Sequence, residues 1–206
     1  MISKDFLVKN IRTLFYIFAL LIAVSTLVLF SQPANALVLT NAFGYLSFSF
    51  LSLSLLVTPV RTVFPTFNLN PVFYMGRRAL GVCAFVFAVA HYAIQLSLNF
   101  AGDPGQVVFF AFSPNGSGLL AGIISLLFLF LLFITSTDFA ARKLGKHWFR
   151  LHQLSYLCYP LIIFHVVSIG IDFKDINFYS GSFACIAMIT IVFELIRFYF
   201  ILKKKK

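Results

Sequence analysis

The sequence predicts an all-α integral membrane protein, a bundle of six transmembrane helices. Of its 206 residues, 61% are hydrophobic and only 11% are charged, and the mean hydropathy is +0.97. A soluble domain needs far more polar surface than this. The apolar residues also gather into runs of about 20, the length of helix that crosses a hydrocarbon core of about 30 Å at a rise of about 1.5 Å per residue.

Each apolar run predicts a helix, because a segment surrounded by lipid must satisfy its backbone polar groups internally. The six runs are residues 11–30, 41–58, 79–100, 118–136, 149–170 and 181–201. The breaks between them contain proline, glycine and polar residues that favour turns: Ser31-Gln32-Pro33, Pro59 with Pro65 and Pro71, Asp103-Pro104-Gly105 with Ser113-Pro114-Asn115-Gly116, and Asp138 to Lys146. We expect residues 1–206 to form a single domain.

The basic residues predict the orientation of the chain. Fifteen of the 16 lysines and arginines fall at the N-terminus, in the second and fourth loops, or at the C-terminus, and only Lys174 falls on the other side. Because basic loops stay in the cytoplasm, the pattern predicts that both termini are cytoplasmic, in the inner membrane. The net charge of +10 would also suit nucleic acid, but its placement between apolar runs favours the membrane explanation.

Residues 1–36 allow a second interpretation. A basic start, an apolar stretch and Ala34-Asn35-Ala36 resemble a signal peptide with its cleavage site. The apolar stretch is about 20 residues, whereas a signal sequence usually has about 7–15. Cleavage would leave five helices with the orientation of the rest unchanged.

The cysteines do not form a recognisable site. Cys83, Cys158 and Cys185 all fall within apolar runs, without CxxC, CxxCH or zinc-finger spacing. The pattern therefore supports neither a disulfide framework nor a zinc site nor covalent c-type haem. We expect all three to be small buried hydrophobic residues.

Histidines carry the chemical signal of the sequence. Three of the four lie within predicted spans, namely His91, His152 and His165, while His147 precedes the fifth span and is expected to be solvated. A charged side chain within the bilayer costs roughly 2–3 kcal/mol, so intramembrane histidines are candidates for function. One histidine alone could merely hydrogen-bond a neighbouring helix, but three on two helices favour a site.

Depth along the helices indicates which histidines can meet. His91 follows Arg78 on the third span, and His165 follows Arg150 on the fifth, by similar numbers of residues. These separations place the two imidazoles at matching depth, about 20 and about 22 Å from the cytoplasmic ends of their helices. Two neutral imidazoles at one depth can bind one haem iron from both sides, which favours electron transfer over dioxygen binding. The 28 phenylalanines suit packing around an apolar haem plate.

His152 lies near the cytoplasmic start of the fifth span and allows two interpretations. It could hold a second carrier, a haem or a flavin, or it could simply be hydrogen-bonded there. Thirteen residues correspond to about 140° around an ideal helix, so His152 and His165 share a face only if Pro160 distorts the helix. Arg77 and Arg78 could bind haem propionates or a flavin phosphate, or anchor the chain at the lipid headgroups.

A set of motifs over residues 40–170 resembles the ferric reductase-like transmembrane domain family. The residues that carry the resemblance are Thr58-Pro59-Val60-Arg61, Arg77-Arg78-Ala79-Leu80-Gly81 followed by His91, Thr135-Ser136, Arg142-Lys143-Leu144-Gly145, Trp148, and Leu151-His152-Gln153-Leu154-Ser155-Tyr156 followed by His165. Within this superfamily the sequence most resembles the haem-binding membrane subunits of MsrQ (YedZ) type. These pass electrons to a periplasmic molybdenum enzyme, MsrP, which reduces methionine sulfoxide in proteins.

The resemblance implies haem b at His91 and His165, a further haem or redox role for His152, and an FMN. It also implies electrons drawn from quinol or from a cytoplasmic flavin reductase. Because four lysines follow the sixth run, we expect the donor to be a separate molecule.

One element departs from the MsrQ pattern, which has Arg-Pro-Tyr at the start of the fourth helix where this chain has Ser113-Pro114-Asn115-Gly116-Ser117-Gly118. A periplasmic protein partner is therefore one of three expectations that stay open. The second is a stand-alone ferric or other metal reductase at the outer face. The third is a transporter or structural membrane protein whose histidines only pack or relay protons.

Overall fold

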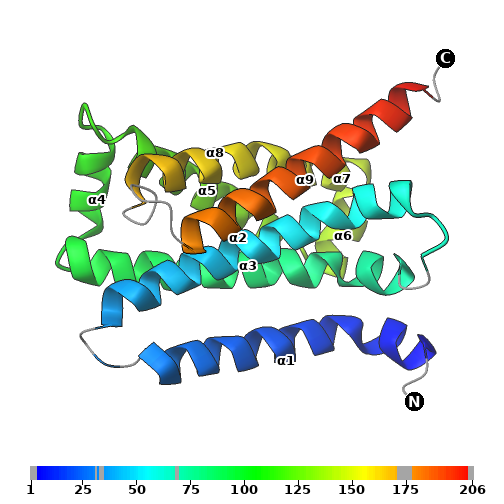
Figure 1. Ribbon diagram of the computed structural model, residues 1–206, viewed down its shortest axis with the longest axis horizontal. Coiled ribbons are helices and arrows are strands. Elements are labelled where there is room, and N and C mark those ends of the chain that lie inside the picture. Colours follow the sequence, from blue (N-terminus) through cyan, green and yellow to red (C-terminus); the bar gives the residue numbers. More distant parts are fainter. Residues whose placement is uncertain (1–3, 31, 33–34, 68–69, 171–177, 204–206) are drawn as a thin grey trace.

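The computed structural model describes residues 4–30, 32, 35–67, 70–170 and 178–203. Within these residues the regular structure is entirely helical, as Figure 1 shows. The helices are α1 (Lys4–Phe30), α2 (Ala36–Val63), α3 (Asn70–Asn99), α4 (Pro104–Ala111), α5 (Ser117–Ile134), α6 (Asp138–Leu144), α7 (Lys146–His152), α8 (Leu154–Ile169) and α9 (Phe178–Lys203).

Six stretches of the described chain are helical, long enough and apolar enough to cross a membrane. The first four in chain order lie in α1, α2, α3 and α5. The fifth, Lys146–Ile169, covers α7 and α8 together, and the last lies in α9. The predicted six-helix, all-α membrane bundle is therefore confirmed, and the chain is a multi-pass membrane protein.

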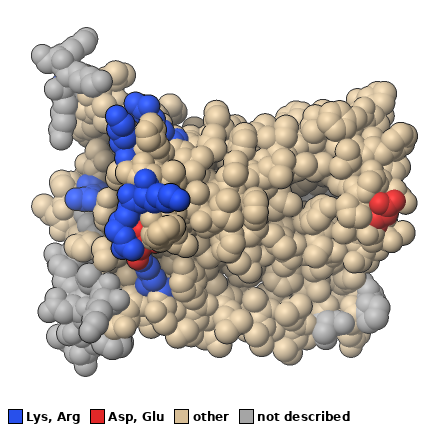
Figure 2. Space-filling model, turned by 180° about the vertical axis from the view of Figure 1, so that it is seen from behind, with Lys and Arg blue, Asp and Glu red and all other residues tan. Residues whose placement is uncertain are grey.

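The hairpin of α2 and α3 forms the centre of the bundle. Helix α9 packs on α2, α1 packs mainly on α3, and α5 packs against both α8 and α3. The start of α1, the end of α9, and the short helices α6 and α7 all lie at one end of the bundle, while α4 lies at the other (Figure 1). Lysines and arginines gather at the first of these ends (Figure 2), which we call the basic end.

Close packing and hydrogen bonds hold these helices together, because lipid tails are as apolar as the side chains they replace. The buried Phe48 ring of α2 lies 4.1 Å from the Phe183 ring of α9 and 5.3 Å from the Tyr159 ring of α8, measured between ring centroids. The Ser47 hydroxyl donates to the Ala84 carbonyl across the α2–α3 hairpin, at 2.8 Å. These contacts make α2 the helix that joins α3, α8 and α9.

The helices extend beyond the apolar runs at the basic end, where the sequence predicted breaks. Helix α2 continues through Pro59 to Val63, and α3 begins at Asn70 instead of residue 79. Pro71 lies in the first turn of α3, where the missing proline N–H would have no partner in any case. Hydropathy marks only the part of each helix that lies in hydrocarbon, so it misses these polar ends.

Two further predictions need correction. The fifth span is interrupted at Gln153, between α7 and α8, whereas Pro160 lies within the continuous helix α8. Cys83 and Cys158 are buried as expected, but Cys185 is exposed, because it lies on an outward face of the peripheral helix α9. His147 is exposed, as predicted, although it lies in α7 and not in a loop.

Some residues used in the sequence analysis lie outside the described part of the chain. They are Ser31, Pro33 and Ala34 of the first break, Lys174 between the fifth and sixth runs, and Lys204 to Lys206 at the C-terminus.

Candidate functional site

His91 of α3 and His165 of α8 face each other inside the bundle. Their ring centroids are 6.3 Å apart, and the ring planes are nearly perpendicular, at 89°. The structure therefore brings together the two histidines that the sequence placed at matching depth. Both side chains are partly buried.

Hydrogen bonds to the backbone determine which ring nitrogen of each histidine carries hydrogen. The Nδ1 atom of His91 lies 2.8 Å from the Thr40 carbonyl oxygen, and that of His165 lies 2.9 Å from the Gly118 carbonyl oxygen. A carbonyl oxygen can only accept, so both Nδ1 atoms donate. In the neutral ring the Nε2 lone pair then remains available to bind a metal, the usual arrangement of metal-binding histidines.

Glycines on the neighbouring helices make room for these rings. A Cβ atom at Gly44 of α2 would lie 3.0 Å from Nδ1 of His91, and one at Gly122 of α5 would lie 2.5 Å from Nδ1 of His165. Real Cβ contacts are essentially never shorter than 3.0 Å. Each imidazole is thus held between a backbone acceptor and a glycine surface.

The donor set fits a haem iron. Imidazole binds a metal at about 2.0 Å and each ring centroid lies about 1.1 Å behind its nitrogen, so two rings on one metal would have centroids about 6.2 Å apart. The observed separation is 6.3 Å. No group of three or more metal-binding side chains occurs among the described residues. Two protein ligands suit an iron whose other four positions are filled by a porphyrin, and not a bare zinc ion with its usual four protein ligands.

His152 lies apart from this pair, at the basic end. Its ring stacks on the Trp148 ring, with the centroids 3.9 Å apart, and its Nε2 atom lies 3.3 Å from the Thr135 hydroxyl oxygen. The Trp148 indole N–H donates to the Thr135 carbonyl at 2.8 Å. Contacts within the protein therefore fix His152. Its ring stacks on Trp148, whereas the ring of His165 faces another histidine.

The two arginines of α3 are also engaged within the protein. Arg78 pairs with Asp138 of α6 and lies over the Trp148 ring, 4.7 Å from its centroid. Arg12 of α1 pairs with the other oxygen of Asp138 at 3.1 Å, and the two arginines lower the pKa of this carboxyl group, Arg12 more strongly. Arg77 donates to the Thr58 hydroxyl at 3.0 Å. These contacts join α1, α3 and α6 at the basic end.

Comparison with known families identifies the chain. The family described as "Ferric reductase like transmembrane component" matches residues 43–163, more than half of the sequence, and this segment includes His91 and His152. The chain belongs to this family. The resemblance found in the sequence motifs is therefore confirmed.

Curated relatives of this ferric reductase-like chain carry the name "Protein-methionine-sulfoxide reductase heme-binding subunit MsrQ". The protein of Agrobacterium fabrum (strain C58) is 34% identical over 127 residues, which are 62% of this chain and 56% of the relative. That of Brucella anthropi is 34% identical over 121 residues (57% and 50%), and that of Brucella ovis 35% over 122 residues (57% and 50%). The chain spans about half the length of the curated relatives it matches. No solved structure matches it.

Some residues of the ferric reductase-like site escaped the sequence analysis. The carbonyl groups of Thr40 and Gly118 leave no sequence signal, because any residue provides a carbonyl. Gly44 and Gly122 give a weak signal, since small residues in a transmembrane helix often mark close helix approach. Asp138 could have been noticed as the acidic residue within the basic fourth loop.

Proposed function

We propose that this chain binds haem b between His91 and His165 and carries electrons across the membrane. The observation that carries the proposal is the pair of imidazoles at 6.3 Å, each with its Nδ1–H bonded to a backbone carbonyl. The names of the MsrQ relatives support it, because those proteins are haem-binding subunits.

The residues around the pair would prepare the site. The carbonyls of Thr40 and Gly118 hold each imidazole in the tautomer that leaves Nε2 free, and thereby set the direction of each ring. The apolar packing of α2, α3, α5 and α8 excludes water and lowers the local dielectric constant. When bound there, haem supplies a one-electron redox couple within the membrane.

The orientation and the partners are part of the proposal. With both termini in the cytoplasm of an inner membrane, the histidine pair lies in the outer half of the bundle and the basic end faces the cytoplasm. Electrons would then enter from quinol or a cytoplasmic flavin reductase and leave to a periplasmic, MsrP-like reductase. The whole chain, 1–206, would act as one domain.

A second carrier at the basic end would shorten the route. His152 with Arg77 and Arg78 would take part in holding it, as a second haem or an FMN. Since each of these side chains already has a partner within the protein, such a group would have to displace those contacts.

Visible spectroscopy of the purified protein tests the proposal. The reduced-minus-oxidised spectrum should show low-spin b-type haem, and His91→Ala or His165→Ala should remove most of it. His147→Ala is the matched control, since His147 is exposed and should leave the spectrum unchanged. Full haem content in both single variants, or no haem in the wild type, would refute the proposal. A wild type without haem would favour the non-redox class of membrane protein.

A stand-alone metal reductase is the second candidate, favoured by the departure from the MsrQ pattern at Ser113–Gly118. Membrane vesicles with the haem reduced distinguish the two candidates. Rapid reoxidation by a ferric chelate alone would support the metal reductase. Reoxidation only after addition of an MsrP-like protein would support the subunit.

A further inference from the structure

A buried ion pair lies on α9, away from the histidine pair. The Oε2 atom of Glu194 is 3.0 Å from the Nε atom of Arg197, and the two side chains are only 13% and 12% exposed. Glu194 precedes Lys203, the end of α9, by nine residues, or about 13 Å of helix. An ionisable group so far inside a membrane helix is costly to keep and is a candidate for function.

The hydrogen bonding of this pair is incomplete. Both carboxylate oxygens of Glu194 and the Nε atom of Arg197 are buried, and within the described chain none has a hydrogen-bond partner of ordinary geometry. Another nitrogen of Arg197 donates to the Tyr156 hydroxyl of α8 at 3.0 Å. A buried carboxylate is costly to keep charged; the Arg197 cation beside Glu194 offsets part of this cost, and binding a proton would remove the charge.

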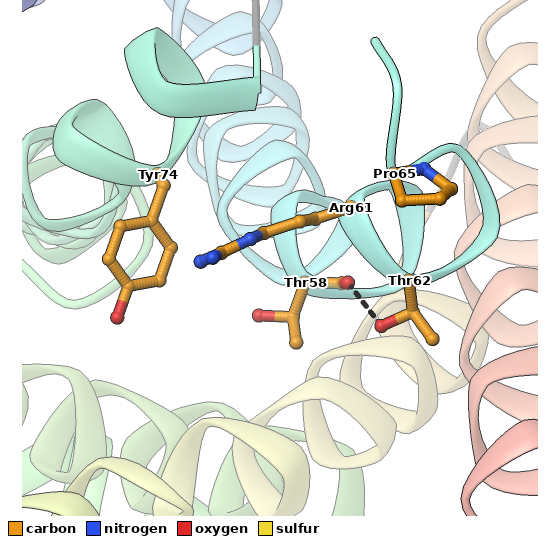
Figure 3. A pocket seen from close by; sticks show the side chains of 5 residues that line it. All are labelled: Thr58, Arg61, Thr62, Pro65 and Tyr74. Carbon is orange, nitrogen blue, oxygen red and sulfur yellow. Dashed lines mark hydrogen bonds between the residues drawn. The ribbon is translucent and has the colours of Figure 1, made fainter.

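A cavity lies at the basic end of the bundle. It has a volume of about 400 Å³ and is lined by Thr58, Arg61, Thr62, Pro65 and Tyr74. In Figure 3 the Arg61 side chain extends across the open space toward Tyr74, and the Thr58 hydroxyl points into it. The cavity thus opens between the end of α2 and the start of α3.

An apolar contact links the edge of the cavity to the part of α9 that carries Glu194. The Thr58 hydroxyl, which lines the cavity, accepts a hydrogen bond from Arg77 at 3.0 Å. The Phe64 ring, next to the cavity residue Pro65, contacts the Phe193 ring with the centroids 6.4 Å apart. Phe193, the residue before Glu194, therefore packs against a residue that adjoins the cavity.

We propose that Glu194 is a proton-binding site, whose carboxylate takes up a proton from water in this cavity when an electron enters the bundle. The carboxylate becomes a neutral carboxylic acid, while a reduced flavin or a quinol supplies the electron that takes the haem iron from ferric to ferrous. The inference rests on the proposed function. Charge uptake in a medium of low dielectric constant is unfavourable, and a proton taken up in the same bundle offsets it.

The groups that face Glu194 allow this change of charge. They are the two cations Arg197 and Arg77 and the phenol of Tyr156. No second carboxylate is among these facing groups, so Glu194 is the side chain in this cluster that can accept the proton.

Infrared difference spectroscopy and redox titration of the haem-loaded protein test the inference. The reduced-minus-oxidised spectrum should contain a carboxylic acid band that shifts in D₂O and disappears in Glu194→Gln. The haem midpoint potential should fall with pH, by at most about 59 mV per pH unit for one proton per electron, and the variant should lose at least half of this slope. Asp103→Asn, at the opposite end of the bundle, should change neither result.

Two additions keep the test decisive. If Glu194→Gln leaves Arg197 unpaired and does not fold, the double variant Glu194→Gln/Arg197→Gln removes both charges and should show the same losses. An unchanged band and slope in a variant with normal haem content would overturn the inference. A wild type without haem would instead refute the proposed function. An infrared pH titration of that haem-free protein would then show whether Glu194 binds a proton. If Glu194 binds none, the inference is overturned.

Discussion

Substituting Gly122 by alanine tests how tightly the structure holds the candidate ligand His165. The new Cβ atom would lie 2.5 Å from Nδ1 of the imidazole, far inside the 3.4 Å where ordinary contacts begin. The ring would have to move by most of this difference, whereas ligand distances in metal sites hold within about 0.2 Å. We therefore expect Gly122→Ala to lose most of its bound haem, at least about fivefold per mole of protein.

Two further glycines make the experiment quantitative. At Gly44 the new Cβ atom would lie 3.0 Å from Nδ1 of His91, which is a milder conflict. Gly44→Ala should therefore retain more haem than Gly122→Ala. At Gly81 the nearest atom is 3.9 Å away, on Ser54, so Gly81→Ala should match the wild type and serves as the control. Haem content, visible spectrum and helical content of each purified variant are the measurements. Normal haem and an unchanged spectrum in Gly122→Ala would refute the reasoning.

The crossed imidazole planes, 89° apart, should give a strongly anisotropic low-spin ferric EPR signal; the rhombic signal of parallel rings would contradict this orientation. Carbon monoxide should bind little, because both axial positions are filled; ready binding would rule out two histidine ligands. His152→Ala should leave the main haem spectrum intact but slow its reduction by quinol or flavin reductase, and an unchanged rate would remove His152 from the route. Asp138, whose pKa is lowered from 3.8 mainly by Arg12, should add a little stability above that pH and progressively less as the pH falls below it, because the carboxyl group is exposed; thermal unfolding in detergent should show a smaller acid loss in Asp138→Asn, and an equal loss would contradict this. Reporter fusions in 104–116 should report the periplasm and C-terminal fusions the cytoplasm, and the reverse would contradict the orientation.

Depth in the membrane could be predicted from the sequence because the rise per residue of an α-helix is constant. Counting from the basic residues was enough to place His91 and His165 at one level. Rotation about the helix axes could not be predicted in the same way, since it depends on which faces pack together. The hydrogen bonds to Thr40 and Gly118 depend on that rotation, and so they became known only from the structure.

The interruption at Gln153 shows a second limit of the sequence. The run 149–170 is continuously apolar enough to suggest one helix, and Pro160 is the residue that rules of helix geometry mark as a kink. In the fold Pro160 stays within α8, and the helix is interrupted at Gln153, next to the segment in which Trp148 and His152 are held against Thr135. The break thus falls beside tertiary contacts at the basic end, which a local rule about proline does not take into account.

The two ends of the bundle differ in how far they are prepared for a cofactor. At the histidine pair, the described residues bond to the rings through Nδ1, and both Nε2 atoms stay available without breaking those bonds. At the basic end, Arg77, Arg78 and His152 are each bonded within the protein, so a ligand there would replace existing interactions. A preformed site binds more tightly because less reorganisation opposes binding. A haem should therefore occupy the histidine pair first, and any second group should bind more weakly and be lost more readily on purification.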